Sequence, residues 1–234
     1  MLLSAFSSQI AYSQVNSQLI ERGDYLYKNR KYKEADSVFT KILDSKFPIN
    51  PKIYLKLAKI ELEKNNDVKA LFYLDTYNQY QPSEQVSKEM LNIAEKNNFE
   101  GYENSTYNSF IFLYKKYAAF PLIGILVLIS YLLFYFYNKR KSNEIIGLRH
   151  FVVISLLILS LLFLANAEER ISDAIVETDN ALLRSQPSAI GEVKGKLSRG
   201  TKINFINSND IWLSVIIDKT LYYVKESDVL IIKK

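Results

Sequence analysis

A run of twenty consecutive uncharged residues, 118–137, constrains this chain more than any other feature. The hydrocarbon core of a bilayer is about 30 Å thick and takes roughly 20 apolar residues as a helix, so this run predicts a transmembrane helix. A second apolar run, 151–167, has 17 residues and lies at the short end of the usual range. Together the two runs predict a membrane hairpin that separates one water-facing module from another.

The composition argues against several classes of protein. The net charge of +5 is modest, and no basic stripe with interleaved aromatic residues predicts a nucleic-acid partner. The chain has no cysteine and a single histidine, His150, which argues against thiol catalysis, disulfides and clustered metal ligands. We therefore expect no metal and no cofactor. Neither apolar run holds an ionisable residue, so the pair predicts an anchor and not a transport pathway.

The charges around the two runs predict a topology. The connecting loop, 138–149, holds four basic residues, and basic residues in short loops stay in the cytoplasm: Lys139, Arg140, Lys141 and Arg149. Both modules would then face the periplasm. Lys115 and Lys116, just before the first run, favour the alternative in which both modules are cytoplasmic.

The first residues, 1–13, resemble the end of a secretory signal, because Ala11-Tyr12-Ser13 before Gln14 fits a small-x-small cleavage site. The alternative is an uncleaved N-terminal segment. An exported N-terminus agrees with a periplasmic first module.

Within the first module, small residues recur at a fixed interval. Gly23 is followed by Ala58 after 35 residues, and Ala35 by Ala70 after the same interval. Small side chains at these places would let paired helices approach closely. Three prolines punctuate the pattern and end helices, because proline lacks the N–H and clashes with the preceding turn: Pro48, Pro51 and Pro82.

This pattern, over about Asn16–Pro82, resembles the tetratricopeptide-repeat family, whose helix pairs recur about every 34 residues. It departs from that family at Arg30 and Asn65, where a turn glycine is frequent. A generic antiparallel helix bundle is the alternative. Two repeats rarely bury enough surface alone, so a third pair of helices, 83–96 and about 105–117, is expected to cap the stack.

The resemblance implies a concave face that binds peptides or partner proteins, made by the first helix of each pair. Carried onto this sequence, that face shows six residues of mixed charge: Asp24, Tyr27, Lys28, Lys59, Leu62 and Glu63. The face lacks the cluster of Lys and Arg that would clamp a C-terminal carboxylate. Ordinary solvated side chains are the alternative interpretation of these residues.

After Ala167 the hydrophobic period changes to that of strands. Short β-branched and aromatic runs alternate, as at Ile203 and Phe205, and Asn, Asp, Gly and Pro separate them. Five or six such strands in a short segment predict a small barrel. Gly200 fits a turn that needs a positive φ angle.

The order of motifs in this segment resembles the bacterial SH3 family. Leu183-Arg184-Ser185 precedes Ile190-Gly191-Glu192-Val193, and Gly200-Thr201 precedes the strand with Trp212. Tyr222-Tyr223 replaces the family's usual glycine–tryptophan pair. The resemblance implies a domain that binds peptides or cell-wall material, or that only packs on a neighbour. An exposed aromatic groove would consist of Trp212, Tyr222 and Tyr223, although Trp212 fits a packing role equally well.

No sequence pattern nominates an active site. The chain has no Ser-x-x-Lys motif, nucleophile elbow, phosphate loop or metal set. We expect a protein that is not an enzyme, with no catalytic residues.

The whole order of segments resembles the BatE-type proteins of the Bacteroides aerotolerance group. The resemblance implies an accessory protein of the bacterial inner membrane, with both terminal modules periplasmic, working beside von Willebrand A-domain membrane proteins and a MoxR-type ATPase. The expected function is a membrane-anchored scaffold that binds partner proteins in a stress-related complex. The alternative is an anchor or envelope sensor that binds peptidoglycan through the C-terminal barrel.

The predicted fold class is a multidomain α and β membrane protein with an N-terminal tetratricopeptide α-solenoid, a two-helix transmembrane hairpin and a C-terminal SH3-like small β-barrel. The predicted segments follow one another along the chain. They are a signal remnant (1–13), tetratricopeptide repeats with capping helices (14–117; repeats about 16–49 and 50–83, capping helices 84–117), a first span (118–137), a basic loop (138–149), a second span (151–167) and the barrel (168–234).

Overall fold

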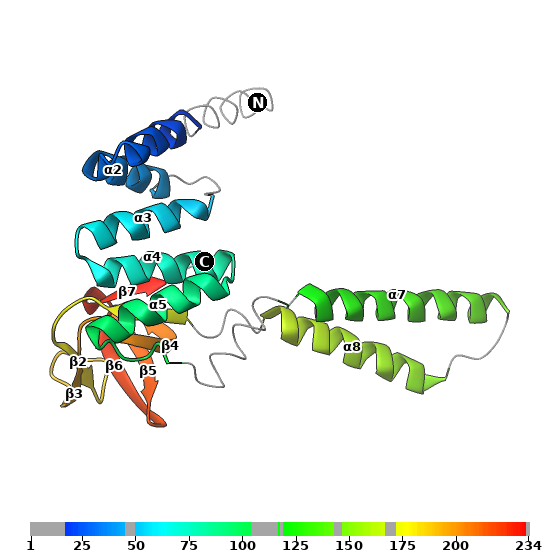
Figure 1. Cartoon of the computed structure of the whole chain (residues 1–234). Helices are drawn as coiled ribbons and strands as arrows, with labels where there is room; N and C mark the ends of the chain where they lie inside the picture. Colours follow the sequence, from blue (N-terminus) through cyan, green and yellow to red (C-terminus); the bar gives the residue numbers. More distant parts are fainter. Residues whose placement is uncertain are drawn as a thin grey trace, which may run out of the picture.

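The computed structural model describes residues 17–44, 50–103, 117, 119–142, 147–166 and 172–232. It contains a stack of helices, a seven-stranded antiparallel sheet and a pair of apolar helices (Figure 1). The predicted mixture of α and β structure is confirmed at this level. The assignment to tetratricopeptide and SH3 families stays a prediction.

Antiparallel helices stack one on another from the N-terminal side of the chain (Figure 1). After a helix over 17–28 come α2, α3, α4 and α5, whose bounds are Tyr32–Leu43, Lys52–Glu63, Asp67–Tyr80 and Glu84–Asn97. A helix, α5, is thus present where the first capping helix was predicted. Its expected partner, 105–117, lies outside the described residues except for Tyr117, as does the predicted signal remnant, 1–13.

A left-handed residue closes the first helix of each pair. Arg30, Asn65 and Asn98 have φ angles of 58°, 58° and 56°, at spacings of 35 and 33 residues. Arg30 and Asn65 are the two positions where the sequence lacks a turn glycine. The backbone there still adopts the conformation that glycine favours, so the recurring turn does not depend on glycine.

The small residues of the repeat lie where helices meet. A Cβ atom added to Gly23 would lie 2.6 Å from Cε1 of Phe39, a residue of α2 that is fully buried. Ala35, Ala58 and Ala70 are also buried. The prediction that small side chains allow close helix packing at these positions is confirmed.

Seven short strands form one antiparallel sheet in the order β3-β2-β6-β5-β4-β1-β7. The prediction of five or six strands was too low, because β2 and β3 have four and five residues and β3 is mostly exposed, with little alternation. The bounds of β1 to β7 are Ser172–Val176, Ala181–Arg184, Val193–Leu197, Lys202–Asn209, Trp212–Ile217, Thr220–Lys225 and Val229–Ile232.

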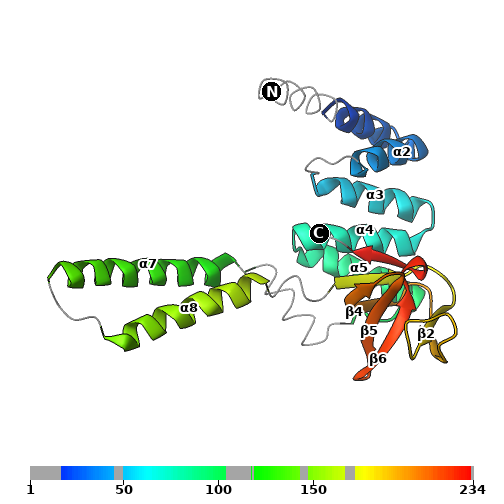
Figure 2. The ribbon, with the colours of Figure 1, turned by 180° about the vertical axis from the view of Figure 1, so that it is seen from behind.

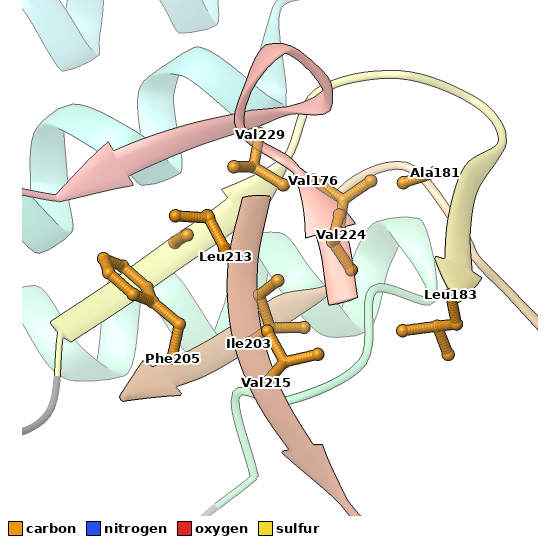
Figure 3. Packing of buried hydrophobic residues seen from close by; sticks show 10 residues of the cluster. Val176, Ala181, Leu183, Ile203, Phe205, Leu213, Val215, Val224 and Val229 are labelled. Atoms are coloured by element: carbon orange, nitrogen blue, oxygen red, sulfur yellow. The ribbon is translucent and has the colours of Figure 1, made fainter. Parts of the chain in front are cut away.

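The sheet curls around a core of its own, seen in Figure 3. Alternate residues of β4, Ile203 and Phe205, point inward, and Leu213 and Val215 of β5 meet them. This inward alternation matches the sequence prediction. Gly200 has a φ of +84°, as its place in a turn predicted.

The two apolar helices, α7 (Ala119–Lys141) and α8 (Leu148–Asn166), lie side by side and extend away from the other described elements (Figures 1 and 2). In the described part of the chain, α7 is the one helix long and apolar enough to cross a membrane. It continues past the predicted end of the first span, because three basic residues in its last turn favour the negative end of the helix dipole. The apolar part of α8, Phe151–Leu164, is shorter, so the second span stays a prediction.

Candidate functional site

The helical stack and the barrel share one hydrophobic cluster, which we call the junction. Strand β1 alternates between two cores: Ala174 and Val176 point into the barrel, whereas Ile175 points to the helices. Ile232 of β7 also points to the helices. Figures 1 and 2 show β7 running alongside α4 in both views. The helical side of the junction comes from α3, α4 and α5: Ala58, Val68, Leu71, Leu74, Met90 and Ile93.

A largely buried ion cluster crosses the junction. The Nζ atom of Lys202 (β4) lies 2.6 Å from Oδ2 of Asp75 on α4 and 3.3 Å from Oδ2 of Asp173 on β1. The Asp75 side chain is 6% exposed and that of Lys202 is 19% exposed. One cation therefore holds a carboxylate from each module in a place that water hardly reaches.

Burial alone lowers the pKa of Lys202, but the carboxylates of Asp75 and Asp173 outweigh it and hold that pKa above its ordinary value. The pKa of Tyr102 is also raised, first by burial and then by the same two carboxylates. Both groups thus keep their protons more firmly in the folded protein. Nε2 of Gln79 adds a hydrogen bond of 3.2 Å to Oδ2 of Asp173.

A main-chain hydrogen bond also links the two modules at the junction. The amide of Lys202 donates a hydrogen bond of 2.9 Å to the carbonyl of Glu100, just after α5. At the next residue, Gly101, an added Cβ atom would overlap the carbonyl of Lys202, and at Gly200 it would overlap the ring of Phe99. Glycine at both places lets the two modules meet at main-chain distance.

A second ion pair at the rim of the junction is exposed. Nζ of Lys69 on α4 lies 3.8 Å from Oε1 of Glu177, and both side chains are well solvated. An exposed pair of this kind contributes little to stability, typically about 0–1 kcal/mol. The buried cluster around Lys202 therefore dominates the polar contacts between the modules.

The sequence did not predict the junction or its ion cluster, although two residues that it singled out, Ala58 and Leu62, lie in or against the cluster. Asp75 interrupts an apolar run on α4, Leu71-Phe72-Tyr73-Leu74, and an acidic residue there is a signal of a buried polar group with a partner. The partner itself could not be found in this way, because Asp75 and Lys202 are far apart in the sequence.

Two of the predicted concave-face residues, Tyr27 and Glu63, interact electrostatically. The pKa of Tyr27 is raised by its partial burial, by Tyr32 and by the charge of Glu63. The rings of Tyr27 and Tyr32 are 5.9 Å apart. A third predicted residue, Asp24, forms an ion pair with Lys56, which the sequence prediction did not include.

The other three predicted residues of that face divide by exposure. Lys28 and Lys59 are exposed, as a ligand contact requires. Leu62 instead packs against the junction cluster, so it contributes to structure. The helical face thus consists of solvated charged side chains beside the partly exposed ion pair of Asp24 and Lys56.

The predicted aromatic groove of the barrel does not form one exposed surface. Trp212 is 6% exposed, and the Arg184 guanidinium lies 6.0 Å from its ring centroid. Tyr222 packs partly against the barrel core. Neighbouring residues of a strand point to opposite faces, so Tyr223 lies on the face opposite to Tyr222, as Trp212 does. Arg184 of β2 is the direct partner of Tyr223 across β2 and β6.

Within the described ranges, no group of three or more His, Asp or Glu side chains is placed to hold a metal ion. Compared with models of known protein families, the sequence matches none, and it has no significant match among curated proteins.

Proposed function

We propose that this chain is a membrane-anchored, non-enzymatic scaffold whose tetratricopeptide-like helices bind a partner protein at the bacterial inner membrane. The observation that carries the proposal is the junction, which joins the helical stack to the barrel next to an apolar helix of membrane-spanning length. A stack of short helices presents a broad solvated face, and such faces suit protein partners. The partner class favoured by the resemblance is a von Willebrand A-domain membrane protein of an aerotolerance complex.

The topology proposed with this function places α7 and α8 across the membrane and both modules in the periplasm. The basic last turn of α7, with Lys139, Arg140 and Lys141, supports a cytoplasmic turn between the helices. A reporter enzyme active only in the periplasm, fused after Lys234, should be active. Activity only of a cytoplasmic reporter at that position would reject the periplasmic arrangement.

Photo-crosslinking in the native membrane tests the partner directly. A photoreactive amino acid replaces Lys59 on the predicted concave face in the full chain, and the control replaces Lys41, an exposed residue of α2. We expect an adduct with a von Willebrand A-domain membrane protein from position 59 and none from position 41. Equal adducts from both positions, or none from position 59, would reject the helical face as the docking element.

The wall-binding alternative depends on the aromatic groove. Since Trp212 is buried and Tyr222 packs towards the core, that groove has less exposed aromatic surface than the sequence suggested. We therefore prefer the scaffold. Sedimentation of the detergent-solubilised full chain with purified sacculi separates the two functions, and co-sedimentation abolished by Tyr223→Ala would favour wall binding.

A further inference from the structure

Three of the exposed apolar side chains of the barrel lie on the neighbouring strands β4, β5 and β6, and we call them the outer patch. Ile206, Ile216 and Leu221 are 54%, 52% and 46% exposed. Ile216 and Leu221 are direct partners across β5 and β6, and Ile206 follows the inward-pointing Phe205 on the neighbouring strand β4. The three side chains thus lie on three adjacent strands, with Ile206 at the register shift of β4.

The chain connections limit how far parts of the barrel can lie from the apolar helices. From Asn166, the last residue of α8, to Ser172, the first of β1, the chain covers six residue steps and reaches at most about 20 Å. Ser172 pairs with Phe205, the residue before Ile206. The start of β1 therefore ties this part of β4 to the end of α8.

The other connection starts next to the same strand. The helical stack ends next to Lys202 of β4, whose amide is bonded to Glu100, and the chain then continues towards α7. Lys202 and Phe205 are three residues apart on one strand. Both connections to the apolar helices thus start alongside β4, which carries one member of the outer patch.

We propose that the outer patch rests on the lipid headgroup layer and so sets the orientation of the two modules over the membrane. This inference depends on the proposed membrane anchoring of α7. Exposed apolar side chains are suited to the boundary between headgroups and acyl chains. The turn between Ile216 and Leu221 carries Asp218 and Lys219, whose charges cancel, so apolar contact and not charge drives the binding.

Three side chains bury little area, so their contact with lipid would be weak in a free domain. Tethering changes this balance. A short connection keeps the barrel at a high effective concentration near the surface, so that a weak contact is occupied most of the time. The tether also explains why a patch this small can be sufficient.

Because the chain has no cysteine, a single introduced thiol can carry an environment-sensitive fluorophore. The full-length Ile216→Cys variant is labelled and reconstituted into liposomes containing lipids with a nitroxide on the headgroup. The matched control is Ile190→Cys, in the β2–β3 loop, where the native side chain is 96% exposed and two strands, β6 and β5, separate β2 from β4. We expect strong quenching at position 216 and little at position 190.

A third label distinguishes the two proposals. Val127→Cys lies on α7, where Val127 is 64% exposed, and lipids with a nitroxide on the acyl chain should quench it if α7 spans the bilayer. Quenching at 127 without quenching at 216 would overturn the outer-patch proposal and leave the anchor intact. A label at 216 that is shielded from water but not quenched by lipid would show that protein covers the patch, which also overturns it.

Discussion

At the scale of single residues, the helical stack carries local strain that its sequence does not relieve. Arg30 has a φ of 58°, a conformation that costs a residue with a Cβ atom about 1–2 kcal/mol. Asn65 holds the same conformation one repeat later, and Asn tolerates it better than Arg. The strain is therefore concentrated in the turn between the helix over 17–28 and α2.

The Arg30→Gly variant should stabilise the protein. Glycine removes the strain but loses more chain entropy on folding, about 0.5–1 kcal/mol, so we expect a net gain of about 0.5–1 kcal/mol in the free energy of unfolding. Asn65→Gly is the control and should gain less. Chemical denaturation in detergent measures both, and a loss of stability in Arg30→Gly would show that its side chain has a role beyond the turn.

The Lys202→Met variant should strongly weaken the junction, because it leaves the carboxylates of Asp75 and Asp173 without their shared cation. Removing one partner of a buried ion pair typically costs about 3–5 kcal/mol. The control is Lys69→Met, which breaks the exposed pair with Glu177 across the same junction and should cost less than about 1 kcal/mol. Similar losses in the two variants, measured by denaturation, would contradict a special role for the buried cluster.

At the scale of elements, hydrophobic period predicted much of the structure because it records local burial. The small residues spaced 35 apart are buried where the first helices meet, and alternation at Ile203 and Phe205 predicted β4. The short strands β2 and β3 gave weaker signals, and the two-sided burial of β1 depends on contacts that no local pattern contains. The candidate binding surfaces stay predictions, and the burial of Trp212 and the partial burial of Leu62 follow from tertiary packing that no local pattern contains.

The turn before β4 offers a test of how closely the elements meet. Gly200→Ala should destabilise the protein by more than about 1 kcal/mol, because φ is +84° and the new methyl group would overlap Phe99. Gly195→Ala on β3 is the control, since its added Cβ would make an ordinary 3.5 Å contact with Leu183. Thermal unfolding measures both variants, and a neutral Gly200→Ala would mean that the loop moves away from α5 at little cost.

At the scale of the whole molecule, the junction couples the unfolding of the two modules. The chain has one tryptophan, Trp212, so its fluorescence reports on the barrel, while circular dichroism reports mainly on the helices. We expect the two signals to change at the same denaturant concentration, apart from a helical remainder due to α7 and α8 in detergent. Loss of the fluorescence signal before the helical signal would contradict this coupling.

Alkaline pH should lower the free energy of unfolding of the protein. The pKa values of Lys202 and Tyr102 are raised above their ordinary values of 10.5 and 10.0, so the unfolded chain loses these protons first. The pKa of Tyr73 is likewise raised to about 12, first by burial. Stability from these groups is complete below about pH 10 and falls as pH rises further. Denaturation midpoints measured from neutral to alkaline pH should therefore fall above about 10, and they should fall less in Lys202→Met.

The double-sided strand β1 has a consequence for how this chain can be divided or recombined. Ile175 and Ile232 belong to the barrel by connectivity and to the helices by packing. Cutting the chain at the apparent boundary near residue 172 would expose hydrophobic surface on both fragments, so neither module can be exchanged independently of the other. A chimera that takes one module from a related protein would also need the surface of the other module that matches it at the junction.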